Sequence, residues 1–138
     1  MIKETIIKKH INFDVDLNKY SNSLLKNIHK KHILVIGGAG TIGSSYIKQI
    51  LKFKPSKITV VDINENGLTE LTRDLRSSNL LDYNPEYITY PVNLLSDTFD
   101  KIFNSESWQV VSNFSAHKHV RSEKDKISVE ALIKNNVY

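Results

Sequence analysis

The chain has 138 residues, of which 40% are hydrophobic and 25% charged, a composition typical of one globular domain with its own core. It contains no cysteine, which excludes disulfides and thiolate chemistry. Its net charge of +4 permits binding to a polyanion, but the lysines are scattered and no aromatic-rich RNA-binding pattern accompanies them. The basic clusters at 8–9 and 29–32 indicate solvated helix ends. We expect no nucleic-acid partner, and a basic nucleic-acid-binding domain is the minor alternative.

Two further features bear on the location of the protein. No apolar run approaches the ~20 residues that a transmembrane helix needs. The amino-terminal stretch MIKETIIKKHINFDVD mixes charges with isoleucines and lacks the apolar core of a secretory signal. We therefore expect a cytoplasmic protein without a membrane partner.

Residues 1–31 are predicted to form a helical extension that packs on the main domain or on a partner. Apolar residues recur there at helical spacing, namely Leu17, Tyr20, Leu24 and Ile28. Asp16 suits the N-cap of this helix, and Lys30 and Lys31 suit its C-terminal end.

From residue 32 onward, strand and helix patterns alternate. The predicted strands are HILVIG, KITVVD, YITYPV and WQVVSNF. The predicted helices lie at 41–53, around 68–75, around 99–103 and around 129–137. The first of these helices carries an apolar stripe of Ile42, Tyr46, Ile50 and Phe53. Pro55 stops that helix, Pro91 marks a strand end or an edge strand, and Trp108 is expected to cover the sheet edge.

This alternation, with nearly continuous apolar strands, indicates a parallel sheet that helices cover on both faces. Right-handed crossovers then give the strand order 3-2-1-4. We expect residues 32–138 to form the N-terminal part of an α/β, Rossmann-type doubly wound sheet, truncated after the fourth strand and the helix that follows it. The flank where a fifth strand would dock is expected to be covered by another copy of the chain or left mobile.

Four of the five glycines fall within the seven residues that follow the first strand. In the spacing Gly37-x-x-Gly40-x-x-Gly43, Gly37 permits a sharp turn, Gly40 a close approach to a pyrophosphate, and Gly43 close packing of helix on strand. Gly38 is predicted to relax the turn. Because the first N–H groups of a helix attract phosphate, the loop predicts dinucleotide binding.

Asp62 ends the second predicted strand, where a carboxylate can accept hydrogen bonds from both hydroxyls of an adenosine ribose. The alternative is that Asp62 caps the following helix. A 2′-phosphate would be repelled by Asp62, and the stretch VVDINENG adds Glu65 and no cation. The sequence therefore favours NAD over NADP.

The glycine spacing resembles that of the extended short-chain dehydrogenase/reductases. Two stretches, GGAGTIGSSYIKQILKFKPSKITVVDINENGL and NFSAHKHVRSEKDKISVEALIKNNV, are similar to bacterial polysaccharide-biosynthesis enzymes of the UDP-N-acetylglucosamine 4,6-dehydratase group and their capsule-synthesis relatives. The resemblance covers residues 32–138. It implies a UDP-sugar substrate that NAD oxidises at C4, loss of water across C5 and C6, return of the hydride to C6, and a 4-keto-6-deoxy product.

The resemblance also implies roles for particular residues. Those at the cofactor are Gly37, Gly40, Thr41, Ile42 and Gly43 at the pyrophosphate, Asp62 at the adenosine ribose, Asn93 near the adenine, and Ser115 and Ala116 at the nicotinamide ribose. Lys118 and His119 would lie on the sugar-nucleotide side, and Asn136 would be a structural residue behind the site.

The family's general base is a tyrosine four residues before a lysine, and none of the six tyrosines here has a lysine at that spacing. We therefore assign no catalytic residue to this chain, although we expect the parent protein to be an enzyme. The alternatives are a non-catalytic dinucleotide-binding or interaction module and another nucleotide-sugar epimerase of the same superfamily. His117 and His119 lack nearby partner ligands in the sequence, so no metal site is predicted.

Overall fold

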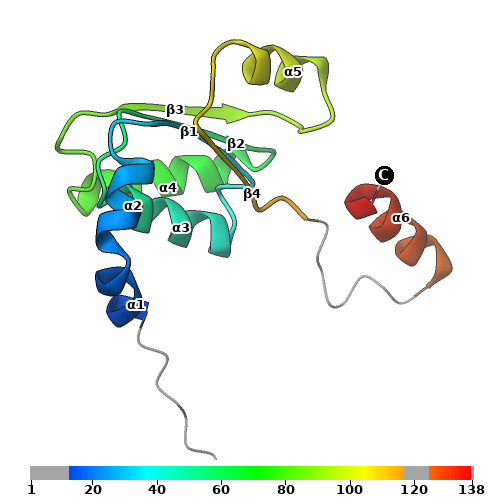
Figure 1. Ribbon diagram of the computed structural model, residues 1–138. Coiled ribbons are helices and arrows are strands. Elements are labelled where there is room, and N and C mark those ends of the chain that lie inside the picture. The colour runs from blue at the N-terminus through cyan, green and yellow to red at the C-terminus, as the bar shows by residue number, and fades with distance from the viewer. Residues whose placement is uncertain (1–12, 117–124, 138) are drawn as a thin grey trace, which may run out of the picture.

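Four parallel strands form the sheet in this computed structural model, which describes residues 13–116 and 125–137 (Figure 1). They are β1 (His32–Ile36), β2 (Lys57–Asp62), β3 (Glu86–Pro91) and β4 (Val110–Asn113). Their order is β3-β2-β1-β4, and in the register Val35 of β1 lies opposite Val60 and Ser112. The predicted strand order is confirmed. Pro91 ends β3, which is an edge strand, as its missing N–H requires.

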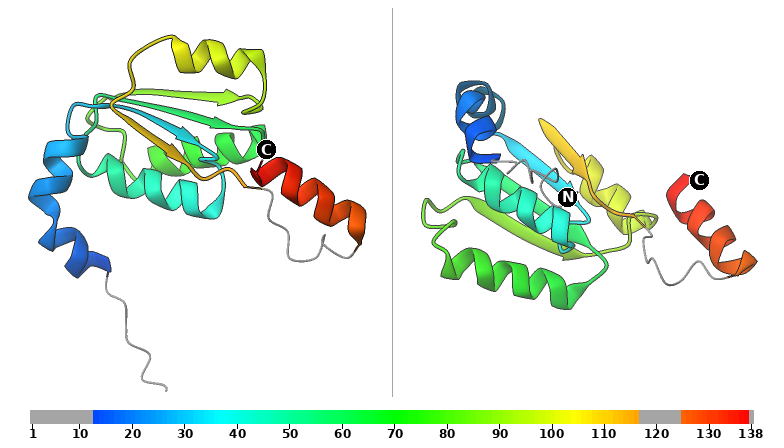
Figure 2. Two further views of the ribbon diagram at one scale, coloured as in Figure 1. Left: turned by 45° about the vertical axis from the view of Figure 1, so that its right-hand side comes forward. Right: turned by 90° about the horizontal axis from the view of Figure 1, so that it is seen from below.

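Helices cover both faces of this sheet. The helices of the described residues are α1 (Phe13–Lys19), α2 (Ser21–Ile28), α3 (Thr41–Leu51), α4 (Glu65–Ser77), α5 (Asp97–Asn104) and α6 (Lys126–Val137), and only some of them lie on the sheet. Figures 1 and 2 show α3 and α4 on one face and α5 on the other. The chain therefore has the Rossmann-like α/β fold that the alternation predicts, with a helical segment before β1. No helix in the described ranges is both long and apolar enough to span a bilayer.

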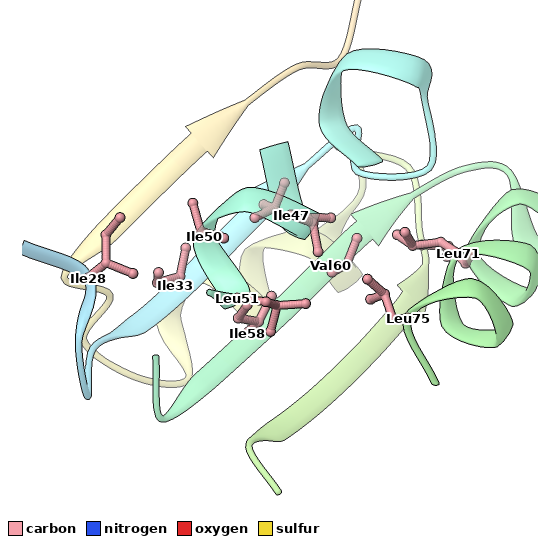
Figure 3. Packing of buried hydrophobic residues seen from close by; sticks show 11 residues of the cluster. Ile28, Ile33, Ile47, Ile50, Leu51, Ile58, Val60, Leu71 and Leu75 are labelled. Carbon is pink, nitrogen blue, oxygen red and sulfur yellow. The ribbon is translucent and has the colours of Figure 1, made fainter. Parts of the chain in front are cut away.

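Two clusters of buried side chains hold the layers together. The larger one lies between the sheet and α2, α3 and α4 (Figure 3), and includes Ile33, Ile47, Val60 and Leu75. The smaller one, under α5, consists of Leu34, Ile36, Val61 and Phe99. Because successive residues of a strand face opposite sides, a sheet that helices cover on both faces needs apolar residues at every position of its central strands. Each fully buried aliphatic side chain contributes about 1.5–3 kcal/mol.

The segment before β1 differs from its prediction in detail. The helical stretch is divided at Tyr20 into α1 and α2, and Asp16 lies inside α1 instead of capping it. An acidic residue in the first turn interacts favourably with the helix dipole without being the cap. Ile28 of α2 is 7% exposed and joins the larger cluster, so α2 packs on the sheet domain. The division of the chain at residue 32 stays a prediction.

Two other elements correct the predicted pattern. The buried stripe of α3 runs through Gly43, Ile47, Ile50 and Leu51, whereas Ile42 is 68% exposed, because it lies on a different side of the first turn from the buried Gly43. Trp108 precedes β4 and donates its indole N–H to the Phe103 carbonyl at 2.9 Å. It packs against the smaller cluster under α5 instead of covering the sheet edge.

Candidate cofactor-binding site

The loop between β1 and α3 lies at the carboxyl edge of the sheet and begins with a constrained glycine. Gly37 has φ +73° and donates its N–H to the Val61 carbonyl at 2.7 Å. A Cβ at this position would lie 2.4 Å from the Ser115 nitrogen and 2.7 Å from the Phe114 carbonyl carbon. Gly37 therefore makes the sharp turn that was predicted, and it does so in contact with the segment that leaves β4.

The next glycine has a packing role that the sequence did not reveal. Gly38 is buried, and a Cβ there would lie 2.3 Å from Val60 Cγ1 and 3.0 Å from Ile47 Cδ1. The prediction that it only relaxes the turn is wrong, because this residue lets the loop sit directly on β2 and α3. A Cβ at Gly43 would lie 2.3 Å from the Gly37 carbonyl oxygen, so Gly43 lets α3 approach the loop backbone.

Gly40 differs from the other three glycines of the loop. It is exposed, has φ −73° and is the N-cap of α3. A Cβ there would meet only the Gly37 carbonyl oxygen, at 3.7 Å, which is ordinary contact. Thr41 and Ile42, which follow it, are exposed as well. The first N–H groups of a helix have no partner within the helix, and Gly40 has no side chain to cap them. This end of α3 therefore fits an anion such as a diphosphate.

Asp62 ends β2 beside this loop and is half-buried. Its Oδ2 accepts the Ala39 N–H at 2.9 Å, and its Oδ1 accepts the Asn64 N–H at 2.9 Å. The N-cap of α4 is Asn64, whose Oδ1 accepts the Gly67 N–H at 2.9 Å, so the alternative that Asp62 caps this helix is wrong. Because each carboxylate oxygen can accept two hydrogen bonds, Asp62 keeps capacity for a ligand hydroxyl.

The remaining predicted cofactor residues follow the neighbouring strands at the same edge. Asn93 is exposed, lies two residues beyond β3 and accepts the Leu95 N–H at 2.9 Å. Ser115 and Ala116 are exposed after β4, and the Ser115 N–H and hydroxyl both donate to Asn113 Oδ1, at 2.9 and 2.7 Å. The structure thus gathers the glycine loop, Asp62, Asn93 and Ser115 at the carboxyl ends of four parallel strands.

Some predicted residues cannot be placed. Lys118 and His119 lie outside the described residues, as does His117. Asn136 lies within α6. Among the residues that the structure does describe, no group of three or more histidine, aspartate or glutamate side chains is arranged to hold a metal ion.

Three exposed aliphatic residues lie at this edge, of which only Ile42 was predicted from the sequence; Ile63 and Leu95 were not. Ile42, Ile63 and Leu95 are 68%, 75% and 77% exposed, and they follow β1, β2 and β3 respectively. The signal was present, since Ile63 directly follows the strand-ending Asp62 and Leu95 lies two residues after Asn93. Side chains of this kind can pack against the flat face of a base while polar neighbours bind its edge.

A cluster of ion pairs lies at the opposite, amino edge of the sheet. Lys57 Nζ lies 2.6 Å from Glu106 Oε1 and 3.0 Å from Glu86 Oε1, and His32 Nδ1 lies 2.8 Å from Glu106 Oε2. Burial raises the pKa of Glu106, but the hydrogen bonds from Lys57 and His32 outweigh it and lower the pKa below its ordinary value. The hydrogen bond to Glu106 raises the pKa of Lys57. This cluster joins the beginnings of three strands and is remote from the glycine loop.

Known proteins resemble this chain in sequence and fold. Residues 33–138 match the sequence model of the family described as polysaccharide biosynthesis protein. The chain is 47% identical over 57 residues to the uncharacterized membrane protein MJ1061 of Methanocaldococcus jannaschii. The aligned stretch covers 41% of this chain and 17% of that protein. It is 28% identical over 102 residues to the capsular polysaccharide biosynthesis protein CapD of Staphylococcus aureus. This aligned stretch covers 69% of this chain and 16% of CapD.

The fold is similar to that of the enzyme WbmF of Bordetella bronchiseptica in complex with NAD+ and UDP, with a TM-score of 0.55 and 18% identity, over 81% of this chain and 30% of WbmF. This chain spans about a sixth of the length of the two curated relatives. Because the family model matches well over half of its residues, the chain belongs to the polysaccharide biosynthesis protein family.

Proposed function

We propose that this chain is the NAD-binding part of a nucleotide-sugar 4,6-dehydratase that acts on a UDP-N-acetylglucosamine-type substrate in surface polysaccharide synthesis. The observation that carries the cofactor part of the proposal is that the exposed α3 start at Gly40 directly follows Ala39, whose N–H is bound by Asp62. An uncapped helix start without side-chain bulk lies next to a strand-ending carboxylate that is held at 2.9 Å from the loop. Family membership and the NAD+ and UDP of the WbmF complex support it.

The residues at this edge of the sheet would each bind a different part of NAD. The N–H groups at Gly40 and Thr41 would bind the diphosphate, and Asp62 would accept hydrogen bonds from the adenosine ribose. Ile63 and Leu95 would contact the adenine faces. When bound, NAD supplies a reversible hydride acceptor for the sugar C4 position. The role of this chain is to hold the dinucleotide in place at the carboxyl edge of the sheet.

The same geometry favours NAD over NADP. Both Asp62 oxygens already bind backbone N–H groups, which keeps the carboxylate at the place where we propose that the ribose binds. The N–H of Gly67 is taken by Asn64, and Glu65 occupies the first turn of α4. A 2′-phosphate placed there would meet negative charge and a capped helix end, which disfavours it.

A binding experiment with the 138-residue chain tests the cofactor proposal. We expect NAD to raise the melting temperature, because a ligand at 100 times its Kd adds about 2.7 kcal/mol to the free energy of unfolding. NADP should stabilise the chain markedly less at equal concentration. An unchanged melting temperature at millimolar NAD would contradict the proposal.

The dehydratase activity requires a separate test, because this sequence lacks a tyrosine four residues before a lysine. The protein encoded by the full reading frame that contains this chain should convert UDP-N-acetylglucosamine to a product that has lost one water, as measured by mass spectrometry. Isomerisation of the substrate without change of mass would favour the epimerase alternative. NAD binding without turnover of UDP-sugars would favour the non-catalytic dinucleotide-binding module.

A further inference from the structure

Hydrogen bonds connect the glycine loop to the start of α4. We call this connection the junction, and it is formed by Ala39, Asp62, Asn64 and Gly67. Asp62 Oδ2 accepts the Ala39 N–H, Asp62 Oδ1 accepts the Asn64 N–H, and Asn64 Oδ1 accepts the Gly67 N–H, each at 2.9 Å. These three bonds form a continuous chain from the loop through the end of β2 to the first turn of α4.

Gly67, the third residue of α4, has no conformational reason to be glycine. It is not among the residues with positive φ, and a glycine inside a helix lowers helix stability relative to alanine. Its surroundings supply the reason. A Cβ at Gly67 would lie 2.9 Å from Ala39 Cβ and 2.9 Å from Asn64 Nδ2. Ala39 Cβ is fixed to the backbone of the loop and cannot rotate away.

We propose that Gly67 and Asn64 are positioning residues for the cofactor loop. The bare Gly67 lets the first turn of α4 close on Ala39, and the Asn64 cap holds that turn in register. Asp62 can then take the Ala39 N–H, so the loop has the shape that a diphosphate needs before any ligand arrives. This inference rests on the proposed NAD site and deepens it, by assigning loop geometry to residues of α4 that act through Ala39.

The close approach of position 67 to Ala39 leaves room for one methyl group, which can be on either residue but not on both. In Gly67→Ala the new Cβ would lie 2.9 Å from Ala39 Cβ, so the loop or the first turn of α4 must shift. We expect NAD affinity to fall about tenfold, since a preorganised loop binds more tightly than a displaced one. In the double variant Ala39→Gly/Gly67→Ala one Cβ is removed as the other is added. Affinity should return to within about threefold of the wild type, and Ala39→Gly alone completes the double-mutant cycle.

A second readout needs no ligand. The Ala39 amide donates to Asp62, so its hydrogen exchange reports whether the junction is closed. Gly67→Ala should speed its exchange about tenfold, and the amide of Val35 in the centre of β1 should exchange as in the wild type. A general loss of stability would instead accelerate both amides.

Two further variants serve as controls. Asn66→Ala changes an exposed neighbour of Gly67 on the same helix and should leave both readouts unchanged. If Gly67→Ala does not fold, Asn64→Ala opens the junction from the cap instead, and Asn64→Ser, which can still cap, should rescue both readouts.

The outcomes separate this inference from the proposed function. Suppose that the wild-type chain fails to bind NAD while Gly67→Ala still speeds the hydrogen exchange of the Ala39 amide. This result would overturn the cofactor assignment, and the junction would still be shown to fix the conformation of the loop. A wild-type chain that binds NAD, with Gly67→Ala or Asn64→Ala equal to it in affinity and in exchange, would overturn the positioning role. Failure of the double variant to recover affinity would overturn it as well.

Discussion

Gly37 and Ser115 approach so closely that a Cβ on Gly37 would lie 2.4 Å from the Ser115 backbone nitrogen. The contact joins the loop after β1 to the chain leaving β4, and these two strands are neighbours in the sheet. From β1 the chain passes to α3 on one face, whereas β4 is reached from α5 on the other face. In doubly wound sheets, ligands bind in the crevice at such a reversal.

Gly37→Ala should destabilise the fold itself. The substitution combines a positive φ with a collision against backbone, so we expect the free energy of unfolding to fall by about 2–4 kcal/mol. Urea unfolding followed by circular dichroism measures it. Wild-type stability in this variant would show that the loop and the segment after β4 are not in contact in solution.

Gly40→Ala should have the opposite profile. Its Cβ would have room within the chain, but alanine is a poorer N-cap than glycine, so stability should fall by no more than about 1 kcal/mol. The same Cβ would point toward the proposed diphosphate, and we expect NAD affinity to drop at least about tenfold. Calorimetric titration with NAD checks this, and equal affinity in the two proteins would remove Gly40 from the site.

Thr59→Val should stabilise the protein. Thr59 is 1% exposed in the centre of β2, and its Oγ1 is buried without a hydrogen-bond partner in the described part of the chain. Replacing the hydroxyl by a methyl group removes that desolvation cost, so we expect a gain of about 1–2 kcal/mol in thermal or urea unfolding.

Thr72→Val is the matched control, because the Thr72 hydroxyl donates to the Leu68 carbonyl at 2.8 Å. The same chemical change should there cost about 1 kcal/mol. A loss of stability in Thr59→Val as large as that in Thr72→Val would mean that the Thr59 hydroxyl is satisfied in solution.

Glu106→Gln should destabilise the protein in a pH-dependent way. The pKa of Glu106 is lowered from its ordinary value of 4.5 in the folded state, so its charged form contributes stability above that value. The contribution disappears as the pH falls through the lowered pKa. At pH 7 we expect the variant to be about 0.5–1 kcal/mol less stable than the wild type, and at pH 3 the difference should largely vanish.

Unfolding curves at pH 3, 5 and 7 test this expectation. Glu70→Gln is the control, because the ion pair of Glu70 with Arg73 is exposed on α4 and should contribute little at any pH. A difference between Glu106→Gln and the wild type that stays constant across this range would show that the carboxylate is not the stabilising form.

Local pattern was sufficient for much of this molecule. Buried strands such as β1 are recognisable because every residue from Ile33 to Ile36 is apolar, and parallel alternation with right-handed crossovers then permits few strand orders. The extension and α3 were less well predicted. Several residues of α3 are apolar, and the choice between the stripes of Ile42 and Ile47 depends on where the helix lies relative to the sheet.

The sequence by itself determined the strand order, the position of the glycine loop and the carboxylate that follows β2, because these depend on hydrophobic periodicity and on backbone freedom within a few residues. Only the tertiary structure decided which glycine serves which purpose: Gly38 packs against Val60, Gly67 against Ala39, and Gly40 against nothing that a Cβ would disturb. It also decided that Asp62 accepts a hydrogen bond from the loop backbone while Asn64 caps α4. The physical reason is that a missing side chain and a hydrogen-bond acceptor acquire their roles from neighbours, and those neighbours come from segments that only folding brings together.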